Sequence, residues 1–176
     1  MFGKILVCLD GSAFAEEILP CASGKALMAQ SEITLLSVAT QDILHYPVPS
    51  GELTGFIPFQ LFFAEAAERE IKMRAYLKKV AAGLTARGLR VASTVIPGLT
   101  VDISDIIVRY SVEHGHDLIA MATHGHRGLK RLFFGSITES VMRKSHVPVL
   151  AVRPNAPPSK RSESPQGAAS LDFATG

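Results

Sequence analysis

The sequence predicts a three-layer α/β fold, in which an open five-stranded parallel sheet carries helices on both faces. Short apolar runs alternate along the chain with longer segments of helical periodicity, and this alternation is typical of parallel strands joined by crossover helices. The apolar runs are nearly continuous, as strands buried on both faces require. The chain has 176 residues, 47% of them hydrophobic, so it is long enough for one well-buried domain and too short for two.

Five apolar runs are the expected strands. They are residues 4–9, 32–38, 90–96, 117–122 and 147–152. The third run is more polar, with Ser93 and Thr94, and is closed by Pro97 and Gly98, so it suits a position nearer the sheet edge. Pro148 fits best near the start of the last strand or on an open edge, where no backbone donor is needed.

The first two expected helices differ in their signals. One begins after Ser12, its N-cap, and continues with small and apolar residues at four- and three-residue spacing, although Pro20 should kink it. The other spans residues 62–87 and ends at Gly88, a natural residue for the position after a helix. Its apolar stripe consists of Met73, Leu77, Val80 and Leu84.

Two further helices are expected in the second half of the chain. Thr100 or Asp102 caps a helix that begins near Ile103 and stops at Gly115. The last helix starts at Ser136, where the sequence Ser-Ile-Thr-Glu matches a capping box.

Two segments have no clear periodicity. Residues 41–60 form a long loop or insertion, and such loops tend to be lids or binding loops in compact domains. The aromatic end of this loop, residues 56–63, is interpreted as an anchor of the next helix to the core rather than a partner-binding patch. Residues 155–176 are rich in Ser, Pro, Gly and Ala, and we expect a disordered tail after a domain of residues 1–154.

Composition limits the classes of function. A formal charge of +2 and a pI of about 8.6 are too mild to predict a nucleic-acid or acidic-membrane partner. Cys8 and Cys21 make neither a disulfide framework nor a redox pair. Signal and membrane-spanning segments are not recognisable, so a reduced, cytoplasmic location is expected.

The stretch 121–136 carries the strongest chemical signal. Gly125 and Gly135 allow backbone angles closed to other residues, and Ser136 opens a helix whose free N–H groups attract phosphate. Ligands of open parallel sheets bind beyond the carboxyl ends of the strands, where the strand order reverses. If the first and fourth strands flank that reversal, Asp10 faces the same crevice as this stretch. Asp10-Gly11-Ser12 can also be read as a simple turn, with no ligand.

Three segments resemble the universal stress protein family over residues 1–154. They are K-I-L-V-C-L-D-G-S at 4–12, D-L-I-A-M-A-T-H-G at 117–125, and G-S-I-T-E-S-V at 135–141 before V-P-V-L-A-V. The resemblance implies a Rossmann-like fold of the adenine nucleotide alpha hydrolase type, with strand order 3-2-1-4-5. It also implies ATP binding and a homodimer formed through the last strand, residues 147–152.

The nucleotide-binding branch of this family has a glycine motif: Gly, two residues, Gly, nine residues, Gly, then Ser or Thr. Gly125, Gly135 and Ser136 match its second half, but Ala122 stands where the first glycine falls. Alanine is tolerated there if the backbone has ordinary strand angles. It is not tolerated where positive φ or closer approach than a methyl group permits is required.

The resemblance also implies which residues bind the nucleotide. Asp10, beside Leu9, would bind the ribose or the adenine, Val38 the base, and Met121 with Ala122 would line the floor. The phosphates would lie by His124, Gly125, Gly135, Ser136, Ile137 and Thr138. Mg²⁺ can accompany the phosphates, with Asp10, Ser136 or Thr138 as near ligands. His124 and His126 alternate, but no further ligand stands at zinc-site spacing, so no resident metal site and no catalytic residue is assigned.

These signals favour a cytoplasmic ATP-binding protein of the stress response, in which nucleotide bound between the first strand and the 125–136 stretch modulates an interaction with an unknown protein partner. Because the sequence has no G-x-x-x-x-G-K-[ST] motif and no evident nucleophile with its base, any ATP hydrolysis should be slow. The alternative, which Ala122 favours, is a dimeric scaffold without nucleotide. An enzyme transferring AMP or phosphate ranks third.

Overall fold

The computed structural model describes residues 2–41, 59–99, 103–123 and 136–153. Five strands within these ranges form one sheet in the order β3-β2-β1-β4-β5. The strands are β1 (Lys4–Cys8), β2 (Glu32–Gln41), β3 (Arg90–Leu99), β4 (Leu118–Ala122) and β5 (Val149–Val152). Each neighbouring pair is parallel. The predicted α/β class and the strand order 3-2-1-4-5 are confirmed.

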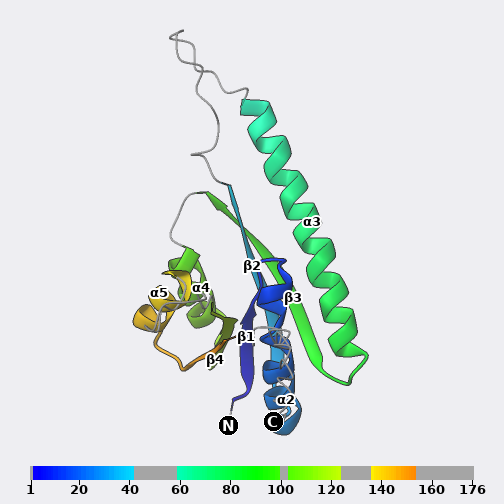
Figure 1. The fold of residues 1–176 in the computed structure, drawn as a ribbon, viewed down its shortest axis with the longest axis vertical. Helices are drawn as coiled ribbons and strands as arrows, with labels where there is room; N and C mark the ends of the chain where they lie inside the picture. The colour runs from blue at the N-terminus through cyan, green and yellow to red at the C-terminus, as the bar shows by residue number, and fades with distance from the viewer. Residues whose placement is uncertain (1, 42–58, 100–102, 124–135, 154–176) are drawn as a thin grey trace, which may run out of the picture.

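Helices cover both faces of the sheet (Figure 1). They are α1 (Ala13–Glu16), α2 (Leu19–Ala29), α3 (Phe59–Thr85), α4 (Ile103–Glu113) and α5 (Ser136–Lys144). Figure 1 shows α2 and α3 on one side of the strands and α4 with α5 on the other. Among the described helices, none is both long and apolar enough to cross a membrane.

The buried core is split into two clusters by the sheet. Side chains alternate along β1, so Ile5 and Val7 belong to the cluster under α2 and α3, whereas Leu6 belongs to the cluster under α4 and α5. This alternation follows from the two-residue period of a strand. A strand that contributes to both clusters must be apolar at nearly every position, which explains the continuous run in the sequence.

The third strand is longer than predicted. It continues past Ile96 through Pro97 to Leu99, with Pro97 opposite Ala39 of β2. Pro97 is compatible with this pairing because β3 lies at the sheet edge, where a residue without an N–H is tolerated. The prediction of an edge position was correct, and the prediction that Pro97 ends the strand was wrong.

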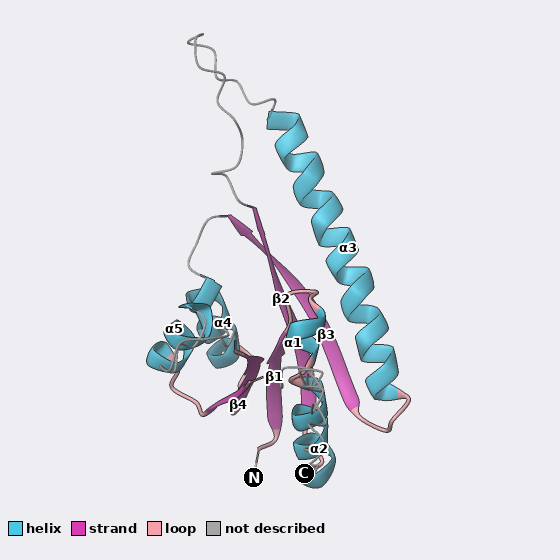
Figure 2. Cartoon of the chain, viewed as in Figure 1, coloured by secondary structure: helices cyan, strands magenta, loops and turns pink. Residues whose placement is uncertain are grey.

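The first predicted helix is broken rather than kinked (Figure 2). Ser12 caps α1 as expected, with its Oγ accepting from the Ala15 N–H at 3.0 Å. The chain then leaves the helix after Glu16 and begins α2 at Leu19. Pro20 therefore occupies the first turn of a new helix, where its missing N–H costs no internal hydrogen bond.

Other boundaries shift by a few residues. β2 extends to Gln41 and α3 begins at Phe59, so both reach into the loop expected at residues 41–60; the rest of that expected loop, 42–58, lies outside the described residues. The last strand begins after Pro148, at Val149. Outside the described part also lie Thr100 and Asp102, the first three residues (56–58) of the aromatic segment 56–63, and the tail from residue 154. Gly88 follows α3 with φ of 85°, as its predicted place after the helix requires.

Candidate functional site

A cavity of about 590 Å³ opens at the carboxyl edge of the sheet. It lies at the ends of β1, β2 and β4 and is bordered by α1, α3, α4 and α5. The strand order runs one way from β1 to β3 and the other way from β4 to β5, so the order reverses between β1 and β4. Open α/β sheets bind their ligands at such a reversal.

The structure brings most of the predicted site residues together at this cavity. Those that line it are Leu9, Asp10, Val38, Met121, Ala122, Ile137 and Thr138. Ser136 is exposed as the first residue of α5 and does not line the cavity. With this boundary, the cap position of α5 falls on Gly135, which lies outside the described residues together with His124 and Gly125.

Asp10 is held in place by the turn that follows β1. Its Oδ1 accepts from the Ser12 N–H at 2.9 Å and from the Ser12 hydroxyl at 2.6 Å. Among the described residues, no hydrogen bond reaches the second carboxylate oxygen, Oδ2. The side chain thus has a fixed orientation and keeps one oxygen to accept hydrogen bonds at the cavity.

Thr138 joins the first turn of α5 to the end of β4. It is only 4% exposed, and its hydroxyl donates to the Ala122 carbonyl at 3.3 Å. This contact places the amino-terminal end of α5 at the cavity. The first N–H groups of a nine-residue helix have no partners within the helix and carry partial positive charge, so they favour an anion.

Ala122 has ordinary strand geometry. It is the last residue of β4 and pairs with Val152 of β5. Within the described ranges, the positive φ angles of non-glycine residues are confined to Gln30. The backbone at Ala122 therefore does not require glycine for its conformation, and only the space that its methyl group occupies distinguishes the two residues.

Sequence reasoning missed the cavity residues that come from α1, α3 and α4. They are Phe14 and Ala15 of α1, Arg69, Lys72, Met73 and Tyr76 of α3, and Ile103 and Ile107 of α4; Cys8, Gly11, Leu36 and Ala39 lie at or near the strand ends. Met73 had been assigned to the apolar stripe of α3, and that assignment is correct because it packs on the core beside Leu77. The helical period shows which residues of α3 share a face. It does not show that the part of the helix before Leu77 borders a cavity.

Gly11 explains how α3 approaches so closely. Its φ is 85°, and a Cβ at this position would lie 3.2 Å from the Met73 Cε. Glycine thus serves two purposes here, because it turns the chain after Asp10 and leaves space for a side chain of the opposite wall.

The titratable groups of the cavity do not include an activated thiol. Burial raises the pKa of Cys8 to about 12, so its thiol stays protonated at neutral pH and is a poor nucleophile. Burial, assisted by Glu16 and Asp10, also raises the pKa of Tyr76. The described lining combines a largely apolar floor with one carboxylate and a helix amino terminus. It is suited to binding a flat apolar group linked to hydroxyls and an anion.

The sequence model of the universal stress protein family matches residues 1–153, a range that includes every described residue. The protein belongs to the universal stress protein family. Its relatives in this family include YxiE of Bacillus subtilis, which is 28% identical over 155 residues covering 87% of this chain and 100% of YxiE.

Universal stress proteins of known structure have the same fold. MJ0577 of Methanocaldococcus jannaschii is 28% identical over 159 residues, covering 87% of this chain and 96% of MJ0577. Its solved structure matches with a TM-score of 0.67 at 26% identity, over 88% of this chain and 98% of that chain. A universal stress protein from Archaeoglobus fulgidus, solved in complex with dAMP, matches with a TM-score of 0.57 at 17% identity over 85% and 96% of the two chains.

Proposed function

We propose that this universal stress protein binds an adenine nucleotide, ATP in the first instance, in the cavity at the carboxyl ends of β1 and β4. Binding modulates the interaction with a regulatory protein partner. The observation that carries the proposal is the joint placement of the Asp10 carboxylate, an apolar floor and the amino terminus of α5 around one cavity.

Each part of a nucleotide has a matching group in this proposal. The base packs on the apolar floor, which Val38 and Met121 help to form. The Oδ2 of Asp10 accepts hydrogen bonds from the ribose hydroxyls or the base amine. The phosphates lie at the start of α5, by Ile137 and Thr138, and reach the predicted contacts His124, Gly125, Gly135 and Ser136. The dAMP complex of the Archaeoglobus fulgidus protein supports the choice of an adenine nucleotide.

Magnesium fits this arrangement as a companion of the phosphates. Mg²⁺ is commonly held by one or two carboxylates together with substrate phosphates and waters, and Asp10 supplies one carboxylate. The proposed activity is binding rather than catalysis, because the sequence has no G-x-x-x-x-G-K-[ST] motif of the kind that cradles phosphates in P-loop nucleotide hydrolases. Any hydrolysis of bound ATP is slow.

The decisive measurement is equilibrium titration of the purified protein with ATP and MgCl₂ by isothermal titration calorimetry. We expect saturable binding, and absence of binding at millimolar ATP would reject the proposal. Chromatography of the nucleotide released from freshly purified, heat-denatured protein would identify the bound species and separate ATP from ADP and AMP.

The alternative function is a scaffold that does not bind nucleotide. Ala122 is the residue that favours it, since its methyl group occupies space beside the proposed base and phosphate positions. The ordinary strand geometry of Ala122 weakens this alternative, because backbone conformation gives no reason for glycine there. A stable oligomer that ignores ATP would support the scaffold.

We further propose that two copies of the chain dimerise through the last strand. β5 lies at an edge of the sheet, and its residues are only partly buried within one chain. An edge strand with unpaired backbone groups is suited to pairing with a second copy. Sedimentation equilibrium of the protein and of Ala151→Lys tests this, because Ala151 is a partly buried residue of the edge strand. We expect a dimer that the substitution converts to monomer, and a monomeric wild-type protein would reject it.

A further inference from the structure

We propose that four polar residues between α4 and α5 form a clamp that sets the position of the amino-terminal end of α5 at the cavity. The α4–α5 clamp consists of Ser104, Asp105, Ser140 and Lys144. The inference rests on the proposed nucleotide binding and assigns positioning residues to that site, none of which touches the ligand.

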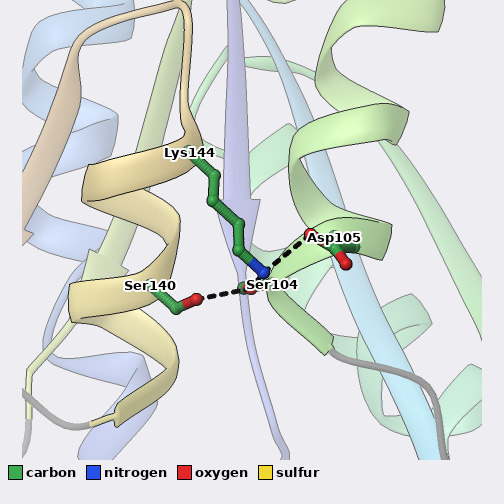
Figure 3. Close-up of polar contacts among 4 residues, drawn as sticks. All are labelled: Ser104, Asp105, Ser140 and Lys144. Atoms are coloured by element: carbon green, nitrogen blue, oxygen red, sulfur yellow. Dashed lines mark hydrogen bonds and ion pairs between the residues drawn. The ribbon is translucent and has the colours of Figure 1, made fainter.

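The clamp is a connected set of hydrogen bonds (Figure 3). The hydroxyls of Ser104 and Ser140 lie 2.8 Å apart. Lys144 donates from Nζ to the Ser104 Oγ at 3.0 Å and to the Asp105 Oδ1 at 2.8 Å. Ser104 is fully buried, and Lys144 and Asp105 are partly exposed. One ammonium group thus joins a surface carboxylate to a buried pair of hydroxyls.

Both helices joined by the clamp also form the cavity wall. Ile103, next to Ser104, lines the cavity, as does Ile107 one turn further along α4. On α5, Thr138 lies two residues before Ser140 and also lines the cavity. A change in the position of α5 along α4 would therefore displace Thr138 and the first N–H groups of α5 relative to the cavity.

Directional polar contacts hold this position better than apolar packing alone. Hydrophobic contacts between helices are non-directional and tolerate repacking, whereas a hydrogen bond weakens steeply as its angle changes. Ser140 and Lys144 are four residues apart and so face the same side of α5. Together they fix both the rotation of α5 and its position along α4.

The same atoms do not form a serine–lysine catalytic pair. Lys144 Nζ is the donor in its contacts with both the Ser104 Oγ and the Asp105 Oδ1, so in this network it does not accept the Ser104 proton. Ser104 has no exposed surface for a substrate. The geometry therefore supports positioning and not nucleophilic attack.

The test compares Ser104→Ala with Ser111→Ala. Both serines are buried in α4, but the Ser111 hydroxyl donates within its own helix, to the Val108 carbonyl. We expect Ser104→Ala to weaken ATP binding about fivefold to tenfold, which corresponds to about 1.0–1.4 kcal/mol, because residues in one hydrogen-bond network are energetically coupled. Ser111→Ala should stay within about twofold of wild type. Calorimetry gives the affinities, and circular dichroism checks folding.

A ligand-free measurement separates positioning from a direct effect on the ligand. In the absence of nucleotide, hydrogen exchange at the amides in the second half of α5, which donate within the helix, should be faster in Ser104→Ala than in wild type and unchanged in Ser111→Ala. Lys144→Met should give the same pattern. In a double-mutant cycle, Ser104→Ala with Ser140→Ala should weaken ATP binding no more than either change alone.

The outcomes distinguish the two proposals. Equal affinities and equal exchange in wild type and Ser104→Ala, with wild-type binding of ATP intact, would overturn the clamp alone. Additive losses in the cycle, or equal losses in Ser104→Ala and Ser111→Ala, would also overturn it. A wild-type protein that binds no ATP would overturn the proposed function, and the clamp as a positioning device for that site with it.

Discussion

At the scale of single residues, the turn after β1 combines two functions that the sequence indicated separately. Ser12 was predicted as a helix cap and Asp10 as a ligand-binding carboxylate. The Ser12 hydroxyl accepts from the Ala15 N–H and donates to Asp10 Oδ1, so one hydroxyl serves the helix and orients the carboxylate. Stability of α1 and geometry of the site are consequently linked through this side chain.

The first prediction concerns this link. Asp10→Ala should weaken ATP binding about tenfold or more, because a hydrogen bond to a charged group contributes about 1.5–3 kcal/mol. Ser12→Ala should lower the free energy of unfolding by about 1 kcal/mol through loss of the cap, with a smaller loss of affinity since the carboxylate remains. Calorimetry with ATP and urea unfolding measure the two effects.

Repeating the titration with 2′-deoxy-ATP decides between the ribose and the base as the partner of Asp10. If Asp10 binds the 2′-hydroxyl, wild type should discriminate between the two nucleotides and Asp10→Ala should not. Equal affinity of wild type and Asp10→Ala for ATP would contradict a binding function for this carboxylate.

A second prediction concerns Ala122. Because its φ is that of an ordinary strand residue, Ala122→Gly gains no backbone relief and should lower the free energy of unfolding by about 0.5–1 kcal/mol. Its ATP affinity should stay within about twofold of wild type. A large gain in affinity would show that the methyl group obstructs the ligand, and would favour the scaffold alternative for the wild-type protein.

At the scale of elements, α3 is the longest described helix, with 27 residues. Its middle and end pack on the sheet through Leu77 and Leu84, which are buried. Away from these buried residues, the helix carries pairs of charges four residues apart, Glu68 with Lys72, both exposed, and Arg74 with the less exposed Glu70. Since exposed pairs of this kind contribute little, packing of the apolar stripe holds the helix in place.

The third prediction tests that conclusion with a matched pair of substitutions in α3. Leu77 is 1% exposed and Ile71 is 66% exposed. Leu77→Ala should lower the free energy of unfolding by about 2–5 kcal/mol through the cavity it creates. Ile71→Ala should change it by less than about 0.5 kcal/mol. Urea unfolding of both variants checks this, and similar losses would mean that the exposed face of α3 is covered by another part of the molecule.

The success of sequence-based prediction also differs from element to element. The strands were predictable because burial on both faces leaves an apolar run, and Ser12 because capping is a local interaction. The break at Pro20 and the extension of β3 through Pro97 were not predictable, because a proline permits several outcomes and its tertiary position chooses among them. Ile103, Ile107 and Tyr76 were missed as cavity residues for a related reason, since only the packing of distant helices brings them to the site.

At the scale of the whole molecule, the edge of the sheet opposite the cavity holds a buried histidine. His116 precedes β4, is 5% exposed, and its Nδ1 has no hydrogen-bond partner among the described residues. The rings of Tyr110 and His114 stack 3.8 Å apart, and the His116 ring lies 5.7 Å from Tyr110. Burial lowers the pKa of His116, and nearby His114 and Lys4 act in the same direction, although the Ser111 backbone and Asp117 oppose it.

The fourth prediction follows from this lowered pKa. Well above pH 6.5, the ordinary pKa of histidine, the residue is neutral in both states and adds no pH dependence. As the pH falls below 6.5, the unfolded chain binds a proton at His116 that the folded protein does not, so the folded state loses stability until the lower pKa is reached. Urea unfolding at pH 7, 6 and 5 should therefore show a decline in wild type that is smaller in His116→Phe. Parallel declines would contradict it.

The unequal strand lengths give the molecule a gradient of rigidity across the cavity. β1 pairs with β2 only as far as Leu36, whereas β2 and β3 stay paired to Gln41 and Leu99, so the strands beyond Leu36 form a two-stranded ribbon (Figure 1). A ribbon of this kind opens more readily than a central strand. Val38 and Ala39 lie on it and line the cavity. A ligand that contacts both this ribbon and the end of β1 would link the two-stranded part of the sheet to its centre and so restrain the opening of the ribbon.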